Sequence, residues 1–302
     1  MKKHVERPKN LKGAVDHQAH LTSENIVNNP WRALRRYTDA RIGLGRAGVS
    51  LPTSEMLDFQ LSHARARDAV KLPLNIEKLQ QQLAEFAPAL PCQPMALHSQ
   101  AFDRTTFLQR PDLGRKLNDI SRNVLLKFTT QQEGDRQLQY DLAIVVADGL
   151  SSIAVQRNVR PLLDQLIPLL KKQSQPCSLA PLTIVEQGRV AIGDEVGQYL
   201  NAKAVLMLIG ERPGLSAPDS LGVYFTWEPK IGLNDARRNC ISNIRPAGLG
   251  FDVAAQRVLY LLKEARRLKT SGVQLKDRSH DKRLEAFEHK RGRTHSFLAK
   301  PS

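Results

Sequence analysis

The sequence predicts an α/β protein in which a helical N-terminal domain precedes a Rossmann-like, doubly wound and mostly parallel sheet. Three observations lead to this prediction. Apolar residues recur at helical spacing in the first part of the chain, strand-like and helix-like segments alternate after it, and hydrophobic residues make up 41% of the whole. The predicted parts are a mobile basic arm (1–28), a helical domain (29–134), an α/β domain (135–276) and a charged tail (277–302).

Capping residues and apolar spacing mark the first helices. Pro30 suits the first turn of a helix that continues through the segment WRALRRYTDARI. Thr53 or Ser54 can cap the next helix, because a hydroxyl oxygen accepts a hydrogen bond from a free backbone N–H. Further helices are predicted at 76–86 and 112–128.

Two stretches of this helical part are predicted to be connectors. The stretch 87–95 contains three prolines, which interrupt regular structure. Gly43, Gly45 and Gly48 satisfy the pattern G-x-G-x-x-G, but a dinucleotide-binding loop needs a strand before it, and here an arginine-rich helical segment precedes it. The glycines are therefore interpreted as a turn between helices.

The α/β part begins with a run of apolar and β-branched residues at 141–147, which is typical of a strand buried on both faces. Turns and amphipathic helices separate similar runs further along the chain. Strands are also predicted at 179–186, 204–209, 222–227 and 239–244, with helices at 161–170, 192–200 and 253–268. This alternation predicts a parallel, doubly wound sheet.

The bulk composition limits the class of protein. A formal net charge of +15 indicates affinity for polyanions or for an acidic partner protein, although arginines on solvated faces would give the same value. Aromatic residues make up only 5%, which disfavours a base-stacking surface. Three widely spaced cysteines favour a reducing cytoplasm over a disulfide framework. Neither a membrane span nor a secretory signal is predicted.

Candidate ligand-binding residues lie in loops that follow predicted strands, where ligands bind in open α/β sheets. These loops are 148–152, 210–214 and 240–246. The backbone N–H groups of Ser151 and Ser152 suit an anion or a polar amide, Glu211 offers an acceptor, and Arg212 and Arg245 offer forked donors. Capped turns with surface charges are the alternative interpretation, and the pattern alone leaves both open.

No catalytic residue or metal site is predicted. The chain has no histidine between Ser99 and Ser279, which excludes a Ser–His or Cys–His pair and a histidine-containing metal cluster from the α/β part. A general base there would have to be a carboxylate, and Asp148 and Glu211 are the candidates. Cys240 is interpreted as a packing or contact residue rather than an activated thiol.

Several long motifs in the same loops resemble the small (light) subunit of the adenosylcobalamin-dependent ethanolamine ammonia-lyase. They are FLQRPDLGRKL (107–117), DGLSS (148–152), the uninterrupted match from Gly188 to Gly214, and NCISNIRPAG (239–248). ARIGLGRAG (40–48) and HARARDAV (63–70) extend the resemblance, which covers 29–275 and follows the family's order.

The resemblance implies one half of a lyase complex. A large subunit is expected to hold ethanolamine and the catalytic residues that convert it to acetaldehyde and ammonia. The small subunit is expected to close over adenosylcobalamin in a hetero-oligomer with several copies of each subunit. The family's cobalamin contacts carry over to Val190, Glu211 and Cys240. The expected location is the cytoplasm or a bacterial microcompartment, with neither nucleic acid nor membrane as a partner.

The absence of histidine agrees with this resemblance at one point. Many cobalamin-binding α/β domains carry a D-x-H-x-x-G motif whose histidine replaces the nucleotide base on cobalt, and this chain has no such motif. The resemblance therefore implies that the cofactor keeps its own base on the metal.

Two rival functions remain open in the sequence. A self-sufficient α/β enzyme or binding protein for a phosphorylated small molecule would explain the helix start at Ser151 and the arginines Arg212 and Arg245. A nucleic-acid-binding protein would explain the net charge, but the chain has no recognised module for that role. Tight phosphate binding, or nucleic-acid binding with a steep salt dependence, would distinguish these rivals from a lyase subunit.

Overall fold

The computed structural model describes residues 26–132, 139–173 and 175–279. They belong to two compact units, one ending at Leu61 and the other beginning at Ser62. Most of the predicted arm (1–28) and of the predicted tail (277–302) lies outside the described residues.

The first unit contains a short β-ribbon, a 3₁₀ helix and the start of α1 (Thr53–Lys71). β1 (Ile26–Val27) pairs antiparallel with β2 (Arg46–Ala47). Pro30–Tyr37 forms a 3₁₀ helix, which is shorter than the helix that the sequence predicts through the segment WRALRRYTDARI. The Asn29 side chain caps it by accepting a hydrogen bond from the Trp31 N–H at 3.0 Å.

A forked ion pair and a glycine-rich turn hold this unit in shape. Arg35 donates two hydrogen bonds to the Glu55 carboxylate, at 2.9 and 2.8 Å, and so joins the 3₁₀ helix to α1. The G-x-G-x-x-G stretch forms the connection between the same two helices. Gly43 has a φ of +60°, and a Cβ there would lie 2.6 Å from the backbone nitrogen of Arg32, so only glycine fits.

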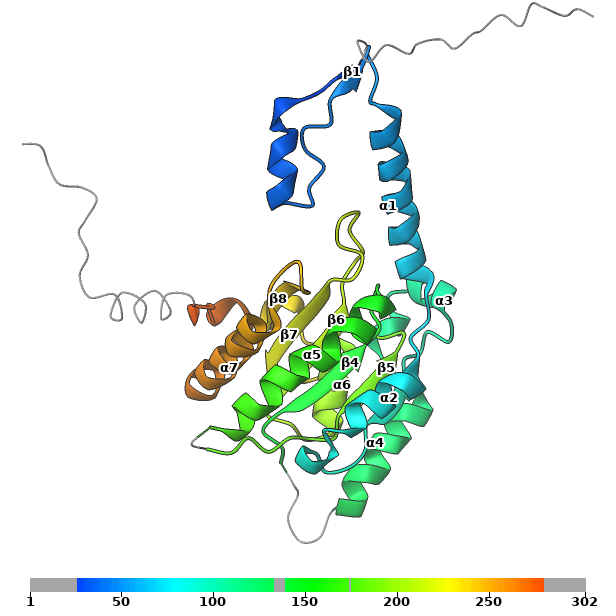
Figure 1. Ribbon diagram of the computed structural model, residues 1–302. Coiled ribbons are helices and arrows are strands. Elements are labelled where there is room, and N and C mark those ends of the chain that lie inside the picture. The colour runs from blue at the N-terminus through cyan, green and yellow to red at the C-terminus, as the bar shows by residue number, and fades with distance from the viewer. Residues whose placement is uncertain (1–25, 133–138, 174, 280–302) are drawn as a thin grey trace, which may run out of the picture. The chain divides into compact units, whose positions relative to one another are not determined.

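The second unit is built around one mixed six-stranded sheet in the order β3-β5-β4-β6-β7-β8 (Figure 1). The strands are β3 (Met95–His98), β4 (Ala143–Ala147), β5 (Thr183–Glu186), β6 (Ala204–Gly210), β7 (Leu221–Trp227) and β8 (Arg238–Ile244). β3, β5, β4 and β6 run parallel, whereas β7 is antiparallel to both of its neighbours. Every residue of β4 and β6 is buried, as their unbroken apolar runs predict.

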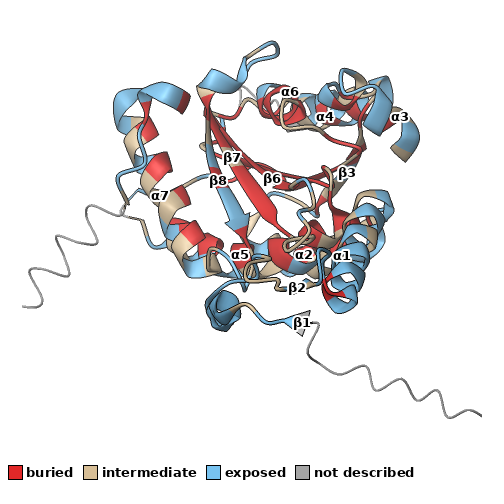
Figure 2. Ribbon diagram, turned by 90° about the horizontal axis from the view of Figure 1, so that it is seen from above, coloured by how far each residue is buried: buried red, intermediate tan, exposed pale blue. Residues whose placement is uncertain are grey.

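Helices cover both faces of this sheet (Figure 2). α2 (Ile76–Ala84), α5 (Ser152–Lys171) and α7 (Phe251–Leu268) pack on one face, and α4 (Asp119–Gln132) and α6 (Ile192–Tyr199) on the other. Each face therefore has its own hydrophobic core. Leu162 and Leu166 of α5 lie in the first core, and Leu125 of α4 lies in the second. Full burial of such a side chain stabilises the fold by about 1.5–3 kcal/mol.

The α/β class is confirmed, but two finer predictions are not. Because β7 and β8 form antiparallel pairs, the sheet is mixed, and a Rossmann-like doubly wound arrangement is not confirmed. A helical N-terminal domain is not confirmed either, because β3 pairs in parallel with β5, with Met95 opposite Thr183. β3 immediately follows Pro94, and a four-residue edge strand shows little periodicity beside three prolines. The predicted domain boundaries stay predictions.

One further helix was not predicted from the sequence. α3 (Arg104–Gln109) begins at Asp103, whose carboxylate accepts a hydrogen bond from the Thr106 N–H at 2.7 Å. Its six residues are too few to show a helical period. None of the helices in the described residues combines the length and the apolar composition that a membrane span requires.

Candidate functional site

A pocket of about 610 Å³ opens at the edge of the sheet where β4 and β6 end. The segments that follow β4, β5 and β6 contribute to its wall, together with β7 and β8. The lining residues are Gly149, Leu150, Arg189, Val190, Ile209, Gly210, Glu211, Arg212, Gly214, Ala217, Ser220, Tyr224, Ser242 and Asn243. This is the edge at which the sequence predicts a ligand site, because parallel strands end there together.

Glu211 lies in this wall directly after β6 and is held by two donors. The Ser220 hydroxyl donates a short hydrogen bond to Oε2, and the Asn243 N–H donates to the same oxygen at 3.2 Å. Among the described residues, both hydrogen bonds to the carboxylate end at Oε2. The Glu211 carboxylate is thereby fixed in direction while Oε1 can still accept a hydrogen bond from a ligand.

Cys240 does not line the pocket itself but lies beside it. It is paired with Tyr224 across the β7–β8 ladder. Although the Cys240 side chain is exposed, the surrounding protein removes enough water to raise the pKa of its thiol. The pKa of Tyr224 is raised by burial as well, with a further contribution from Cys240. Both groups are therefore neutral at pH 7 and act as hydrogen-bonding groups rather than as nucleophiles.

Val190 reaches the pocket from the loop between β5 and α6. The Arg189 N–H donates to the Gly114 carbonyl at 2.7 Å, and Gly188 packs so closely that an added Cβ would lie 2.8 Å from the Cβ of Ala147. These contacts hold the loop against the end of β4. The structure thus brings Val190 and Glu211 to one pocket and Cys240 next to it, while their role as cofactor contacts stays a prediction.

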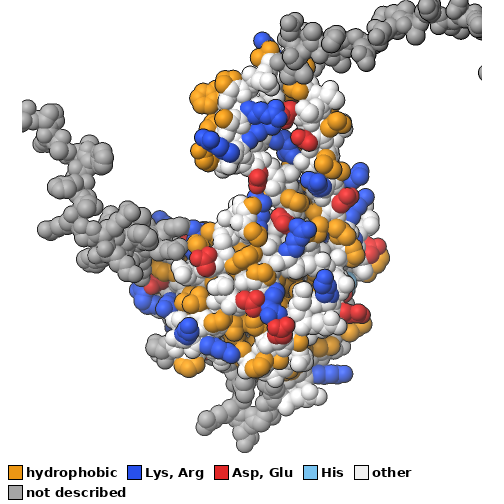
Figure 3. Space-filling view, in the orientation of Figure 1, with side chains coloured by type: hydrophobic (Ala, Val, Ile, Leu, Met, Phe, Trp, Pro, Cys, Tyr) orange, Lys and Arg blue, Asp and Glu red, His pale blue; other side chains and the backbone are white. Residues whose placement is uncertain are grey.

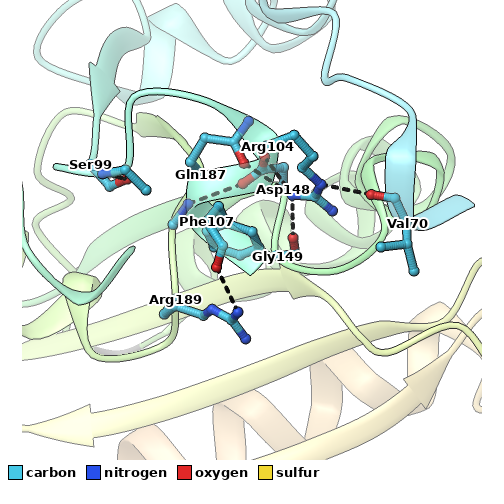
Figure 4. A network of polar contacts seen from close by, with 10 residues as sticks. Val70, Ser99, Arg104, Phe107, Asp148, Gly149, Gln187 and Arg189 are labelled. Carbon is cyan, nitrogen blue, oxygen red and sulfur yellow. Dashed lines mark hydrogen bonds and ion pairs between the residues drawn. The ribbon is translucent and has the colours of Figure 1, made fainter. Parts of the chain in front are cut away.

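Behind the pocket lies a buried network centred on Arg104 of α3 (Figure 4). Its guanidinium forms an ion pair with Asp148 at 3.3 Å and donates to the Gly149 carbonyl at 2.8 Å, the Gln187 side chain at 3.2 Å and the Val70 carbonyl at 2.6 Å. Arg104 therefore ties α1 and the ends of β4 and β5 together. The sequence offers no signal for this pairing.

Asp148 is enclosed in this network and is only 2% exposed. Burial raises the pKa of its carboxyl to about 6, although the positive charge of Arg104 and the Gly188 N–H, at 3.1 Å, oppose the shift. Asp148 is not among the residues that line the pocket. Its carboxylate is committed to Arg104 and to the backbone, so the structure does not offer it as the general base that a self-sufficient enzyme would need.

Three other predicted ligand groups have different surroundings. Ser151 caps α5, accepting from the Ala154 N–H, and its own N–H donates to the Asp148 carbonyl. Ser151 and Ser152 are fully buried and do not line the pocket, so a ligand site at this helix start stays a prediction without support from the pocket. Arg212 lines the pocket, whereas Arg245 does not and donates instead to the Asn243 side chain at 3.0 Å.

Ser220 and Tyr224 were missed because of the direction of β7. The sequence predicts a mostly parallel sheet, in which the start of β7 would lie at the opposite edge. Because β7 runs antiparallel to β6, its start and Ser220 just before it reach the pocket. A turn as short as 211–220 between two strands, too short for a crossover helix, is the signal that would have indicated this direction.

Other features of the described structure do not involve the predicted site residues. In residues 26–132, 139–173 and 175–279, no three His, Cys, Asp or Glu side chains are grouped to hold a metal ion. A second pocket, of about 770 Å³, lies around Trp227 and Lys269 and includes none of the predicted site residues. On the face shown in Figure 3, the Lys and Arg side chains of the six-stranded unit are scattered among apolar and acidic ones.

Comparisons with known proteins agree with the resemblance in the motifs. The family model for the ethanolamine ammonia-lyase light chain (EutC) matches residues 28–276. The chain is 55% identical over 258 residues to the ethanolamine ammonia-lyase small subunit of Pseudomonas fluorescens (strain Pf0-1), covering 85% of this chain and 90% of that protein.

Two further relatives carry the same name. The small subunit from Azotobacter vinelandii is 53% identical over 259 residues, which cover 86% of this chain and 92% of the relative. That from Ralstonia nicotianae is 52% identical over 265 residues, which cover 88% and 94%. The similarity therefore extends through both units and includes every residue of the pocket.

Proposed function

Because the chain belongs to the ethanolamine ammonia-lyase light-chain family, we propose that it binds adenosylcobalamin jointly with a larger subunit in a hetero-oligomer. The larger subunit holds ethanolamine and the catalytic residues that convert it to acetaldehyde and ammonia. When bound, the cofactor supplies homolytic cleavage of its cobalt–carbon bond, which starts this reaction. The small subunit itself contributes binding, orientation and shielding.

One observation carries the proposal. Val190 and Glu211 line one pocket at the carboxyl edge of the sheet, and Cys240 is paired across the β7–β8 ladder with Tyr224 of the pocket wall. These three residues come from the loop after β5, the end of β6 and the middle of β8. Such convergence is what a binding site at a sheet edge requires.

The size and chemistry of the pocket fit a shared corrinoid. Pockets for drug-sized ligands measure about 300–1,000 Å³, and a corrinoid with its nucleotide loop is larger than such ligands. A pocket of about 610 Å³ therefore suits part of the cofactor and leaves the remainder to a second protein. Its wall offers a carboxylate, hydroxyl groups and backbone groups that match the amide side chains around a corrin ring.

Within this proposal, the residues of the chain have distinct tasks. Glu211, oriented by Ser220 and Asn243, accepts hydrogen bonds from the amides of the ligand. Val190 excludes water from the same wall, and Cys240 stays a neutral thiol that contributes a weak polar contact. We extend the proposal to a reducing cytoplasm or a bacterial microcompartment, because Cys92, Cys177 and Cys240 are all unpaired.

Glu211→Ala tests the proposal in the enzyme assembled with its larger subunit. The variant loses a charged acceptor, so adenosylcobalamin affinity should fall by about 10-fold or more while subunit assembly stays intact. Glu228→Ala is the matched control, because Glu228 lies in the other pocket. Titration by corrin absorbance gives the affinity, and size-exclusion chromatography gives the assembly.

Two results would contradict the proposal. Unchanged affinity in Glu211→Ala removes Glu211 from the site. Turnover of ethanolamine by the purified single chain with adenosylcobalamin would show that this chain holds the catalytic residues itself.

A further inference from the structure

Two arginines lie against one aromatic ring beside the pocket. The guanidinium carbon of Arg104 is 4.8 Å from the centre of the Phe107 ring, and that of Arg189 is 4.2 Å from it. Figure 4 shows Phe107 between the two. Stacking on an aromatic face stabilises a guanidinium and fixes its plane. Arg189 is thus held in one orientation beside a second positive charge.

The two arginines differ in how their charges are balanced. Arg104 has an ion pair with Asp148. Arg189 donates from Nη2 to the Phe107 carbonyl at 2.9 Å, its Nε is buried without an acceptor, and it has no ion pair within the described part of the chain. Only Arg189 of the two lines the pocket. A partly buried guanidinium without a carboxylate is a costly arrangement unless a ligand supplies the negative charge.

The acidic group in the pocket wall does not supply that charge. Glu211 is the only acidic residue among those that line the pocket, and its carboxylate is engaged by Ser220 and Asn243 on the strand side. Arg212 adds another positive charge to the wall, but its side chain is exposed. The pocket therefore combines an oriented hydrogen-bond acceptor with a fixed, unneutralised forked donor.

We propose that Arg189 binds the phosphodiester group in the nucleotide loop of the cofactor, with Phe107 and the Arg104–Asp148 pair as positioning residues. This inference rests on the function proposed above. Adenosylcobalamin with its own base bound carries one phosphodiester, which is its single anionic group at neutral pH. A guanidinium matches phosphate oxygens with two parallel hydrogen bonds, and a site of low polarity strengthens them.

The test compares two corrinoids that differ in one phosphate, adenosylcobinamide and adenosylcobinamide phosphate, on the assembled enzyme. The wild type should bind the phosphate form more tightly. In Arg189→Gln this preference for the phosphate form should disappear. The affinities for adenosylcobinamide phosphate and for adenosylcobalamin should fall by about 10- to 100-fold, whereas the affinity for adenosylcobinamide should change by less than about 2-fold. Arg189→Lys keeps the charge but loses the fork, and should retain an intermediate advantage.

Matched variants distinguish direct binding of the phosphate by Arg189 from a general electrostatic effect of nearby positive charges. Arg115→Gln removes a nearby positive charge that does not line this pocket, and should leave the phosphate advantage intact. Arg212→Gln should also leave it intact, and loss of the advantage in that variant alone would assign the phosphate to Arg212 and overturn the proposal. Thermal unfolding of each variant shows whether Arg189→Gln has merely loosened the fold, which would weaken adenosylcobinamide equally.

The outcomes distinguish this inference from the proposed function. Failure of the wild type to bind any corrinoid refutes the proposed function. Corrinoid binding with an unchanged phosphate advantage in Arg189→Gln refutes only the role of Arg189. If inorganic phosphate binds the chain through Arg189 without competing with the corrinoid, the site takes free phosphate and the inference is wrong.

Discussion

Two arginine–aspartate pairs with buried carboxylates in the six-stranded unit have the same chemistry but different surroundings. Asp148 pairs with Arg104, and Asp194 of α6 pairs with Arg238 at the start of β8. Both aspartates are 2% exposed, and burial raises the pKa of each to about 6. A perturbed pKa alone therefore does not tell a site residue from a structural one in this protein.

The partners of the two arginines make the difference. Arg238 also donates to Asp235 at 2.7 Å and to the Leu233 carbonyl at 3.1 Å, so it joins the segment before β8 to α6. Arg104 instead donates a hydrogen bond to the carbonyl of Gly149, and Gly149 lines the candidate cofactor pocket. We conclude that the Arg238–Asp194 pair stabilises the fold, whereas the Arg104–Asp148 pair also shapes the site.

Arg238→Met should have the largest effect, and the effect should be on stability. The substitution leaves Asp194 buried without its cation, which costs about 3–5 kcal/mol of unfolding free energy. Denaturant unfolding measures this cost. Arg157→Met is the control, because the Arg157 side chain is 66% exposed in its pair with Asp219, and such a pair contributes about 1 kcal/mol or less. Equal losses in the two variants would remove the distinction between buried and exposed pairs.

Asp148→Asn and Asp194→Asn separate the two pairs by function. Both variants should lose about 1–3 kcal/mol of stability, because each leaves a buried or partly buried arginine with a weaker partner. Only Asp148→Asn should weaken corrinoid binding by the assembled enzyme, by about 3- to 10-fold. Its affinity is measured by absorbance titration at a temperature where both variants are folded. A similar loss of affinity in Asp194→Asn would contradict the conclusion that only the Arg104–Asp148 pair shapes the site.

The pH dependence of stability should show the smallest effect and the same sign for both pairs. Because each carboxyl has a pKa of about 6 in the folded protein, above its usual value, the folded state binds the proton more tightly than the unfolded chain. The resulting stabilisation of the folded state is fully present below pH 4 and is lost as the pH rises through 6.

Unfolding measured at several pH values checks this sign. Relative to the wild type, each Asp→Asn variant should lose less stability between pH 4 and pH 6.5, by on the order of 1–3 kcal/mol. Taking the difference between variant and wild type cancels carboxyls such as Glu55, whose pKa the hydrogen bond from Arg35 lowers. A steeper fall in the variants would mean that the aspartates are stabilised as anions in the folded state.

The sequence by itself determined the features that depend on local pattern. The buried strands β4 and β6 follow from unbroken apolar runs, and the position of Glu211 follows from its place directly after one of them. The long motifs also identified the family, which the comparisons confirm.

Only the tertiary structure decided the features that depend on pairing between distant segments. β3 becomes a strand because β5 offers it an edge, and β7 brings Ser220 and Tyr224 to the pocket because it runs antiparallel to β6. Arg104 meets Asp148 across 44 residues of sequence. Such contacts are selected by the packing and charge balance of the whole fold, which no local window of the sequence contains.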